Sequence, residues 1–275
     1  MKLSSVVLLV TLVLLLFAMF ATNIALKKEY DKIDKSDLYW TYGTILEQPF
    51  KHLRIEGGNI THIVFEQSKK SSVRVFKNWQ GYENKMVQAF VKNDTLFVKF
   101  PEISDPGEKR YMGFITPVRI FSPELLSVNA YNTSFRLSKL KQKSISITAS
   151  GRSKVVVESF LHDFDSIHVS QTDSTNVGFA MSPELIGTDA GITMSEDGIS
   201  SVASSGGPRI ITPSSIFAAE KISSRETLTV KTLEASVQGV SLLDVGHFQI
   251  NSLKLNIADT SGIILSGGTL RNFKR

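Results

Sequence analysis

The chain of 275 residues contains no cysteine. This absence excludes a disulfide-stapled scaffold, a cysteine-ligated zinc site, a Cys-x-x-Cys redox centre and a thiol nucleophile. It is compatible with an oxidising compartment in which disulfides are simply not used. The content of hydrophobic residues, 42%, is typical of a folded globular protein and argues against wholesale disorder.

Motifs that carry catalysis or cofactor binding are also missing. The sequence has no H-E-x-x-H, no H-x-H, no carboxylate-rich calcium loop and no G-x-S-x-G nucleophile turn. Its glycine pairs, Gly57-Gly58 and Gly267-Gly268, are not followed by Lys-Ser/Thr or by a helix, as a phosphate site requires. An arginine-rich helix and a zinc-finger spacing are absent too. We therefore expect no enzyme, no catalytic, cofactor-binding or metal-binding residues, and no nucleic-acid partner.

The sequence comes closest to a reactive cluster at His162 and His168, with Asp163 and Asp165 between them. Acidic residues in such segments commonly cap turns, so we interpret these four as solvated turn residues. Hydrolysis of sugars needs two carboxyl groups about 5 to 9.5 Å apart. If neighbouring repeats stack, Asp165 could lie beside an acid of the next repeat, and no residue in the sequence selects such a pair.

A long apolar run near the N-terminus is the strongest single signal. No charged residue lies between Lys2 and Lys27, and Thr11 is the only polar residue in the central part of this run. As a helix that rises about 1.5 Å per residue, the segment reaches across most of a bilayer core about 30 Å thick. We predict a signal anchor over residues 1–26 that contacts the lipid bilayer through residues 4–22.

A cleavable signal peptide is the alternative for this segment. Its apolar region is usually only about 7–15 residues long. The candidate cleavage pairs fit the small-residue rule poorly: Ala18 with Phe20, Met19 with Ala21, and Asn23 with Ala25. Four lysines between residues 27 and 35 would favour a cytoplasmic position for the chain that follows. Large domains are translocated largely regardless of such charges. We expect a single-pass membrane protein whose C-terminal body is extracytoplasmic, either periplasmic or on the cell surface.

The rest of the chain repeats a pattern in which two alternating apolar residues are followed, ten positions later, by a second such pair. Alternation with a period of two buries one face of a strand, and small polar residues between the pairs let the chain turn. A looser unit has Leu228/Val230 and Val240/Leu242. The pattern itself occurs four times, as Ile63/Phe65 with Val73/Val75, Ile145/Ile147 with Val155/Val157, Ile167/Val169 with Val177/Phe179, and Leu253/Leu255 with Ile263/Leu265.

Repetition of this kind is typical of a β-solenoid, because each coil buries its apolar edge only against a neighbouring coil. The units that begin at Ile145 and Ile167 start 22 residues apart, which suits one coil, and their gaps contain turn residues such as Ser150-Gly151. We predict an all-β protein with short stacked strands in a β-helix-like solenoid, preceded by the transmembrane helix. A β-sandwich of ordinary hairpins is the alternative fold.

Composition divides the chain into four regions. They are predicted as an anchor at 1–26, a polar stem at 27–49, an antiparallel β region at 50–117, and a repetitive β-solenoid region at 118–275.

Three local features stand out within the last two regions. Asn93-Asp94 predicts a tight hairpin, because both residues tolerate the left-handed conformation. Prolines bound a predicted surface loop at 101–117. An irregular stretch near 180–215, rich in glycine, proline and serine, interrupts the repeats.

Charge is unevenly distributed, although the formal net charge is only +5. Residues 1–160 contain 23 Lys+Arg against 14 Asp+Glu, whereas residues 161–275 contain 8 against 12. A basic half could favour an anionic partner such as a lipid surface or an acidic polysaccharide. Lysines also solvate strand edges and hinder edge pairing, and we prefer this structural interpretation.

The run from Val118 to Val128, VRIFSPELLSV, resembles a strand–Pro–x–Leu–x–x–strand passage of a bacterial family named putative auto-transporter adhesin, head GIN domain. The small-residue corner at 149–153, ASGRS, is similar to corners in that family. The resemblance covers about residues 115–180 and, more weakly, 225–270. It implies an envelope-facing β-solenoid with no known catalytic residues and an adhesin-like role.

These observations support one main functional hypothesis and two alternatives. We expect a membrane-anchored, extracytoplasmic β-solenoid with a non-catalytic binding, adhesin-like or scaffolding role at the cell envelope. An envelope polysaccharide or protein would be its partner besides the bilayer. The first alternative is a solenoid enzyme that acts on an acidic polysaccharide. The second is an envelope sensor, which the very short cytoplasmic tail implied by this orientation disfavours.

Overall fold

The computed structural model describes residues 3–32, 37–138, 140–158, 164–180, 229–246, 248–265 and 269. The chain divides into two compact units, Met1–Tyr42 and Gly43–Arg275, and each is described by itself. Apart from Ala180, the irregular stretch predicted near 180–215 lies outside the described residues.

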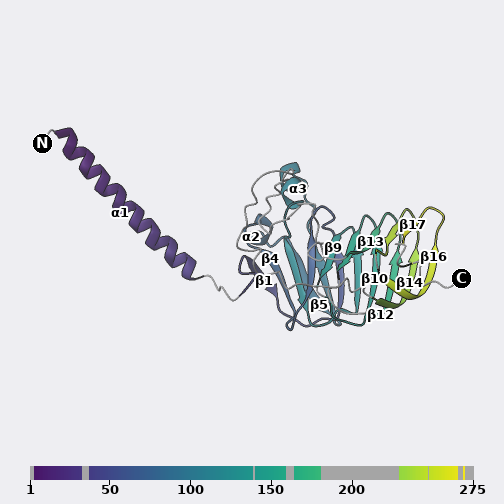
Figure 1. Cartoon of the computed structure of the whole chain (residues 1–275). Coiled ribbons are helices and arrows are strands. Elements are labelled where there is room, and N and C mark those ends of the chain that lie inside the picture. The colour runs from purple at the N-terminus through teal and green to yellow at the C-terminus, as the bar shows by residue number, and fades with distance from the viewer. Residues whose placement is uncertain are drawn as a thin grey trace. The chain divides into compact units, whose positions relative to one another are not determined.

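The first unit contains a single long helix, α1 (Leu3–Asp31), which comprises 29 residues and would measure about 44 Å (Figure 1). From Val7 to Asp31 it is long and apolar enough to cross a membrane, and none of it is buried in the rest of the protein. The hydroxyl of Thr11 donates to the carbonyl oxygen of Val7 at 2.9 Å, and Thr22 bonds in the same way to the residue four before it. Both hydroxyls are therefore satisfied by the helix itself and do not interrupt its apolar surface.

The second unit is built from two mixed β-sheets, so the all-β prediction holds for this body (Figure 1). Two short helices accompany them, α2 (Gln80–Glu83) and α3 (Pro106–Met112). The eight-stranded sheet has the order β16-β14-β12-β10-β8-β2-β6-β5, and the nine-stranded sheet has the order β1-β4-β7-β3-β9-β11-β13-β15-β17. The strands are β1 (Tyr42–Leu46), β2 (His52–Glu56), β3 (Ile63–Gln67), β4 (Ser72–Phe76), β5 (Gln88–Lys92), β6 (Thr95–Lys99), β7 (Val118–Ser122), β8 (Ser127–Tyr131), β9 (Ser134–Ser138), β10 (Ser144–Ser150), β11 (Lys154–Glu158), β12 (Phe164–Gln171), β13 (Asn176–Ala180), β14 (Thr229–Val237), β15 (Leu242–Asp244), β16 (Gln249–Ile257) and β17 (Gly262–Ile264).

Pairs of consecutive strands form the repeating element of the body. In each pair the first strand belongs to the eight-stranded sheet and the second to the nine-stranded sheet, and the pairs follow the same order in both sheets. Neighbouring pairs run parallel in each sheet. Among the described residues the pairs are β2–β3, β6–β7, β8–β9, β10–β11, β12–β13, β14–β15 and β16–β17.

Register explains how these pairs share one core. Ile145 on β10 lies opposite Ile167 on β12, which in turn lies opposite Leu233 on β14. All three side chains are at most 1% exposed, and they belong to a single buried cluster with residues of the nine-stranded sheet such as Val155 and Val177. Parallel pairing in register therefore stacks the apolar residues of successive strands into columns. Each residue in a column is buried because it packs against its register partners on the adjacent strands.

Two of the predicted repeat units are confirmed in full. Ile145/Ile147 with Val155/Val157, and Ile167/Val169 with Val177/Phe179, are buried and lie on β10–β11 and β12–β13. The unit at Leu253/Leu255 with Ile263/Leu265 falls on and just after β16–β17, where Leu253, Ile263 and Leu265 are partly buried and Leu255 is exposed.

The other two units were assigned to the wrong residues. Ile63/Phe65 and Val73/Val75 lie on β3 and β4, which both belong to the nine-stranded sheet; the true unit is Leu53/Ile55 with Ile63/Phe65. In the looser unit, Leu228 lies outside the described residues, and Val240 is 71% exposed. The buried residues are Leu233/Ala235 with Leu243/Val245, which restores the spacing of ten.

The region 50–117 combines parallel and antiparallel pairing. β5 and β6 form the predicted hairpin, and Asn93 and Asp94 both adopt positive φ angles, 50° and 54°, at its turn. β4 pairs antiparallel with β7. β2 and β3, in contrast, pair parallel with β8 and β9. The segment 101–117 contains α3 and buries Ile103 and Met112, so it contributes to the core as well as to the surface.

Corners after the eight-stranded sheet are turned by residues that tolerate positive φ. Asn132, Gly151, Asp173 and Gly239 have φ angles between 50° and 74°. The Gly151 amide donates to Oδ2 of Asp173 at 2.8 Å, and the Arg152 amide donates to Oδ1 of Asn132 at 2.9 Å. Successive corners are therefore tied to one another, which fixes the register of the strands that leave them.

Buried hydroxyl groups follow several of these corners. Ser153 Oγ lies 2.7 Å from the carbonyl oxygen of Ser150, and the hydroxyls of Thr175 and Ser241 are 3.0 Å apart. All three residues are at most 3% exposed. Each hydroxyl satisfies polar groups that the turn would otherwise bury without a partner.

Candidate binding face

The outward side of the eight-stranded sheet carries a line of polar residues. Side chains of a strand alternate between its two faces, so the residue after each inward apolar residue points outward. On β8, β10, β12, β14 and β16 these outward residues lie directly opposite one another in register. We name them the polar row: Asn129, Thr148, Ser170, Ser236 and Asn256.

The hydrogen-bonding groups of the polar row are available to a partner as far as the described residues are concerned. Within the described part of the chain, none of the five side chains bonds to another residue. Three of them are exposed and the other two are half-buried. Strands lie about 4.8 Å apart, so the row presents donors and acceptors at that spacing over about 19 Å.

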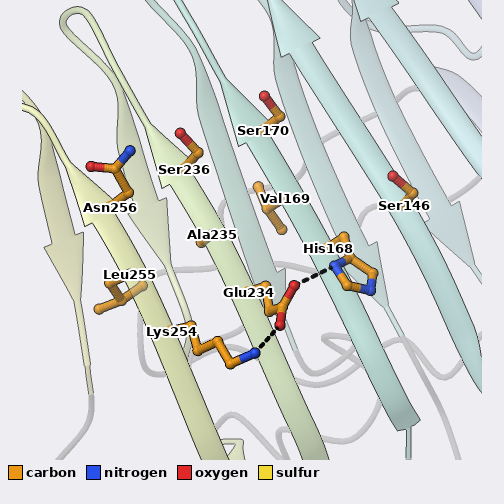
Figure 2. A pocket seen from close by; sticks show the side chains of 10 residues that line it. All are labelled: Ser146, His168, Val169, Ser170, Glu234, Ala235, Ser236, Lys254, Leu255 and Asn256. Atoms are coloured by element: carbon orange, nitrogen blue, oxygen red, sulfur yellow. Dashed lines mark hydrogen bonds and ion pairs between the residues drawn. The ribbon is translucent and has the colours of Figure 1, made fainter.

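Beside the polar row runs a second line, the charged trio His168, Glu234 and Lys254, also in register. His168 and Lys254 both point to Glu234 (Figure 2): Nδ1 of His168 lies 3.1 Å from Oε2, and Nζ of Lys254 lies 2.6 Å from Oε1. The hydrogen bond from Lys254 is the main cause of a lowered pKa of the Glu234 carboxyl. Glu234 is therefore ionised at neutral pH, and both of its oxygens already have partners.

A shallow, open depression of about 490 Å³ lies on this part of the face. Its polar lining comes from the charged trio, from Ser146 and from the polar-row residues of β12, β14 and β16 (Figure 2). Among the described residues that line it, Glu234 is the single carboxylate. The depression can therefore offer hydrogen bonds to a ligand, but it lacks the pair of acids that sugar hydrolysis requires.

An arginine and two phenylalanines continue the line of the polar row across the remaining three strands of the sheet. Arg54 on β2 lies opposite Asn129, Phe97 on β6 lies opposite Arg54, and Phe90 on β5 lies opposite Phe97. The two phenyl rings stack with centroids 5.1 Å apart and an interplanar angle of 8°, and Phe90 is 52% exposed. The same line thus passes from polar to apolar surface over all eight strands.

A second depression of about 420 Å³ lies near a corner at Gln67, Pro123 and residues 141–144. Its amides have structural partners: Nε2 of Gln67 donates to the carbonyl oxygen of Pro123 at 2.6 Å, and the Lys141 amide donates to Oε1 of the same glutamine at 2.6 Å. These bonds hold the chain at the corner. The polar row is the better candidate for a binding site, because its five side chains form no hydrogen bond with another described residue.

Residues singled out in the sequence take different places. His168 belongs to the charged trio, whereas Asp165 faces Lys231, with Oδ1 and Nζ 2.6 Å apart, and so has a base as its cross-strand neighbour. His162, Asp163 and Gly267-Gly268 lie outside the described residues. No group of three His, Asp or Glu residues suited to a metal ion occurs in the part of the chain that the structure describes.

The polar row was missed in the sequence, although a signal for it exists. Thr148, Ser170 and Asn256 each follow the second apolar residue of a repeat pair, and Ser236 follows Ala235 in the same way. Each unit therefore has a small polar residue at the same place. The signal becomes legible only once the units are correctly aligned.

Together these features define a class, an all-β body of two mixed sheets with a polar outer face and an apolar N-terminal helix. No family model matches the chain, and no curated protein matches it. Solved structures that are similar to it include a putative adhesin from Bacteroides fragilis NCTC 9343, at 13% identity, with 81% of this chain and 96% of that chain covered and a TM-score of 0.34.

Two further structures come from Parabacteroides distasonis ATCC 8503. One is a putative lipid binding protein, at 14% identity, with 81% of this chain and 92% of that chain covered and a TM-score of 0.31. The other is a putative adhesin, at 14% identity, with 82% and 96% covered and a TM-score of 0.30. All three TM-scores lie below 0.5, so these likenesses do not indicate a function for this chain.

Proposed function

We propose that this protein is a membrane-anchored β-solenoid whose body lies outside the cytoplasm and binds a partner at the cell envelope without catalysing a reaction. The observation that carries the proposal is the polar row, a set of uncommitted hydrogen-bonding side chains on a rigid sheet. Binding and catalytic residues are usually found where a rigid scaffold presents groups that the fold itself does not need.

The parallel ladders support the solenoid. Each pair of strands crosses once from one sheet to the other, and the next pair continues in the same direction. In the unit that contains Ile145 and Val155, these two residues of the two sheets are only ten positions apart along the chain, which leaves no room for a separate crossover element. Along the chain we assign the stem to 27–49, the β region with the hairpin to 50–117 and the repeats to 118–275; β2 and β3 of the earlier region belong to the same ladders as the repeats.

The properties of α1 support the anchor. Its apolar side chains are exposed from Val7 onward, and exposing so many in water would be unfavourable, at about 25 cal/mol per Å² of apolar surface. A bilayer provides the matching solvent, because the helix satisfies its own backbone and hydroxyl groups. We assign the span to residues 4–22.

Non-catalytic binding fits the chemistry of the face better than the enzyme alternative. Asp165 is paired with Lys231, and Glu234 is paired with His168 and Lys254. Among the described residues, the neighbours of these carboxylates on the adjacent strands are bases: Lys231 for Asp165, and His168 and Lys254 for Glu234. The resemblance of Val118–Val128 to an adhesin-like family supports the same interpretation.

Reporter fusions would test the proposed topology. An enzyme active only in the periplasm and one active only in the cytoplasm are fused in turn after Leu38 and after Arg275. We expect activity only from the extracytoplasmic reporter at both positions, and membrane association that survives a high-salt wash. Activity from the cytoplasmic reporter alone, or release of the body by signal cleavage, would contradict the proposal.

A further inference from the structure

We propose that the polar row is the binding site for a neutral, extended glycan chain that lies across the strands of the eight-stranded sheet. This inference rests on the proposed function, because it names the class of ligand for the same face. It assigns the hydrogen bonds to Asn129, Thr148, Ser170, Ser236 and Asn256, which we have shown to be in register.

Hydroxyl and amide groups are the matching partners for sugar hydroxyls. A serine or threonine hydroxyl donates one hydrogen bond and accepts others, and an asparagine amide also does both. A sugar hydroxyl also donates and accepts, so either the sugar or the side chain can be the donor of the hydrogen bond between them. Since these five side chains bond to no other described residue, a glycan does not have to break a bond within the fold to reach them.

The arrangement favours a polymer over a single sugar. The five groups repeat at the strand spacing of about 4.8 Å along a straight line, and a polymer with regular units can meet several of them at once. Short side chains on a sheet have little conformational freedom to lose, so the entropic cost of ordering them on binding is small. Multiple weak hydrogen bonds then add along one chain.

Charge on the face indicates a neutral ligand. Glu234 already accepts from Lys254 and His168, and Arg54, within the same row, lies 2.9 Å from the carboxylate of Glu56. Lys254, His168 and Arg54 therefore each lie next to a carboxylate. A polyanion would have to compete with these carboxylates and would be repelled by them.

The aromatic end of the row adds an apolar contact. Phe90, stacked on Phe97, exposes about half of its surface at the far edge of the sheet. The C–H face of a sugar ring is apolar and packs on an aromatic ring, which buries surface from water on both. The line of eight strands, about 34 Å long, then offers polar contacts along most of its length and one stacking contact at its end.

Binding of defined glycans to the full chain in lipid nanodiscs would test this inference. The neutral probes are cellohexaose and mannohexaose, and the acidic probe is hexagalacturonate, each titrated by calorimetry at low and high salt. Ser170→Trp places a bulky ring in the middle of the polar row. Ser174→Trp is the matched control, because this exposed serine lies four residues later at the corner, away from the face.

We expect a neutral hexasaccharide to bind with an affinity that salt changes little. Ser170→Trp should weaken this binding at least about tenfold, and Ser174→Trp should leave it within about twofold. Ser170→Ala, which removes one hydroxyl without a steric change, should weaken it about two- to tenfold. Circular dichroism of each variant reports whether the sheets remain folded.

Four results would overturn the inference or the function beneath it. Binding of neither neutral probe would overturn the inference and leave the topology to the reporter fusions. Binding of hexagalacturonate alone, weakened by salt, would show that the neutral ligand class is wrong. Neutral binding that Ser170→Trp does not affect would show that the site is elsewhere. Shortening of any probe would contradict the non-catalytic function itself.

Discussion

The edge strands at the two ends of the body are paired and covered differently. At one end, β5 and β4 pair antiparallel with β6 and β7, and Trp79 is buried beneath them against Phe100, with ring centroids 5.4 Å apart. At the other end the outermost strands are β16 and β17, which are paired parallel on one side. There Leu255 is 38% exposed and Ile264 is 48% exposed.

This difference follows from how repeats are stabilised. A repeating unit buries its apolar edge against the next unit, so a stack of identical units has no way to end itself. A different local geometry is needed, and the hairpin β5–β6 with the α2–α3 segment supplies it at the first end. Residues in the middle of the stack should therefore be more sensitive to substitution than residues of the last described unit.

The largest effect should come from a charge in the middle of the stack. Ile147 is 0% exposed, so Ile147→Asp buries a carboxylate without a partner and should lower the free energy of unfolding by about 3–5 kcal/mol. The matched variant Leu255→Asp, in the last described unit, should cost about 1 kcal/mol or less. Urea unfolding of the detergent-solubilised chain, followed by far-ultraviolet circular dichroism, measures both. Equal losses would remove the distinction between the middle and the end.

The next effect tests the first end. Trp79 is 2% exposed, stacks on Phe100 and donates from Nε1 to Glu108 at 3.0 Å. Trp79→Ala should lower the free energy of unfolding by about 3–4 kcal/mol through cavity formation. Tyr111→Ala, at a residue of α3 that is 44% exposed, should change it by about 0.5 kcal/mol or less. Chemical unfolding followed by far-ultraviolet circular dichroism measures the free energy of unfolding of both variants. If Trp79→Ala lowers it only slightly, the aromatic core does not stabilise this end.

A corner glycine should give a smaller loss. Gly239 has φ +74°, and a Cβ there would lie 2.4 Å from the carbonyl oxygen of Asp173 at the preceding corner. Gly239→Ala should therefore cost at least about 1–2 kcal/mol. Gly178→Ala is the control, since the nearest atom to its added Cβ is 3.9 Å away, and it should stay within about 0.5 kcal/mol of the wild type. Chemical unfolding of both variants decides whether the corners fix the stack.

The smallest effect concerns the outer face. Lys254 holds the pKa of Glu234 below its ordinary value chiefly through a hydrogen bond, so Lys254→Met should raise that pKa. Lys231→Met should instead raise the pKa of Asp165, whose carboxyl accepts from Lys231. NMR titration of the two carboxyl carbons measures both values. A shift of both pKa values in either variant would show that the two pairs are coupled across the face.

Local pattern predicted the individual strands, because alternation and turn residues act within a few positions. The hairpin at Asn93-Asp94 and the buried pairs on β10–β11 were legible for this reason. The pairing partners of the strands, in contrast, could not be predicted from the sequence. Ile167 on β12 lies opposite Leu233, 66 residues further along the chain, and no local property of either residue records that distance.

Small residues and short corners hid other units. Ala235 is buried in a repeat pair, but alanine is too small and too common to be recognised as an apolar position. Between β8 and β9 the corner is one residue shorter than in the next unit: Val128 and Phe135 are seven positions apart, whereas Ile147 and Val155, which lie opposite them, are eight apart. The polar row depends on the same alignment, so it could not be recognised before the units were placed.

Engineered cysteine pairs test the stacking of coils most directly, because the chain has no cysteine of its own. Ser170→Cys combined with Ser236→Cys places two thiols opposite each other on parallel strands, about 4.8 Å apart, within the range that a disulfide bridges. Ser170→Cys combined with Asn176→Cys places them where a hairpin of β12 and β13 would bring them together. We expect mild oxidation to cross-link the first pair and to leave the second reduced. Cross-linking of the second pair but not of the first would contradict the stack.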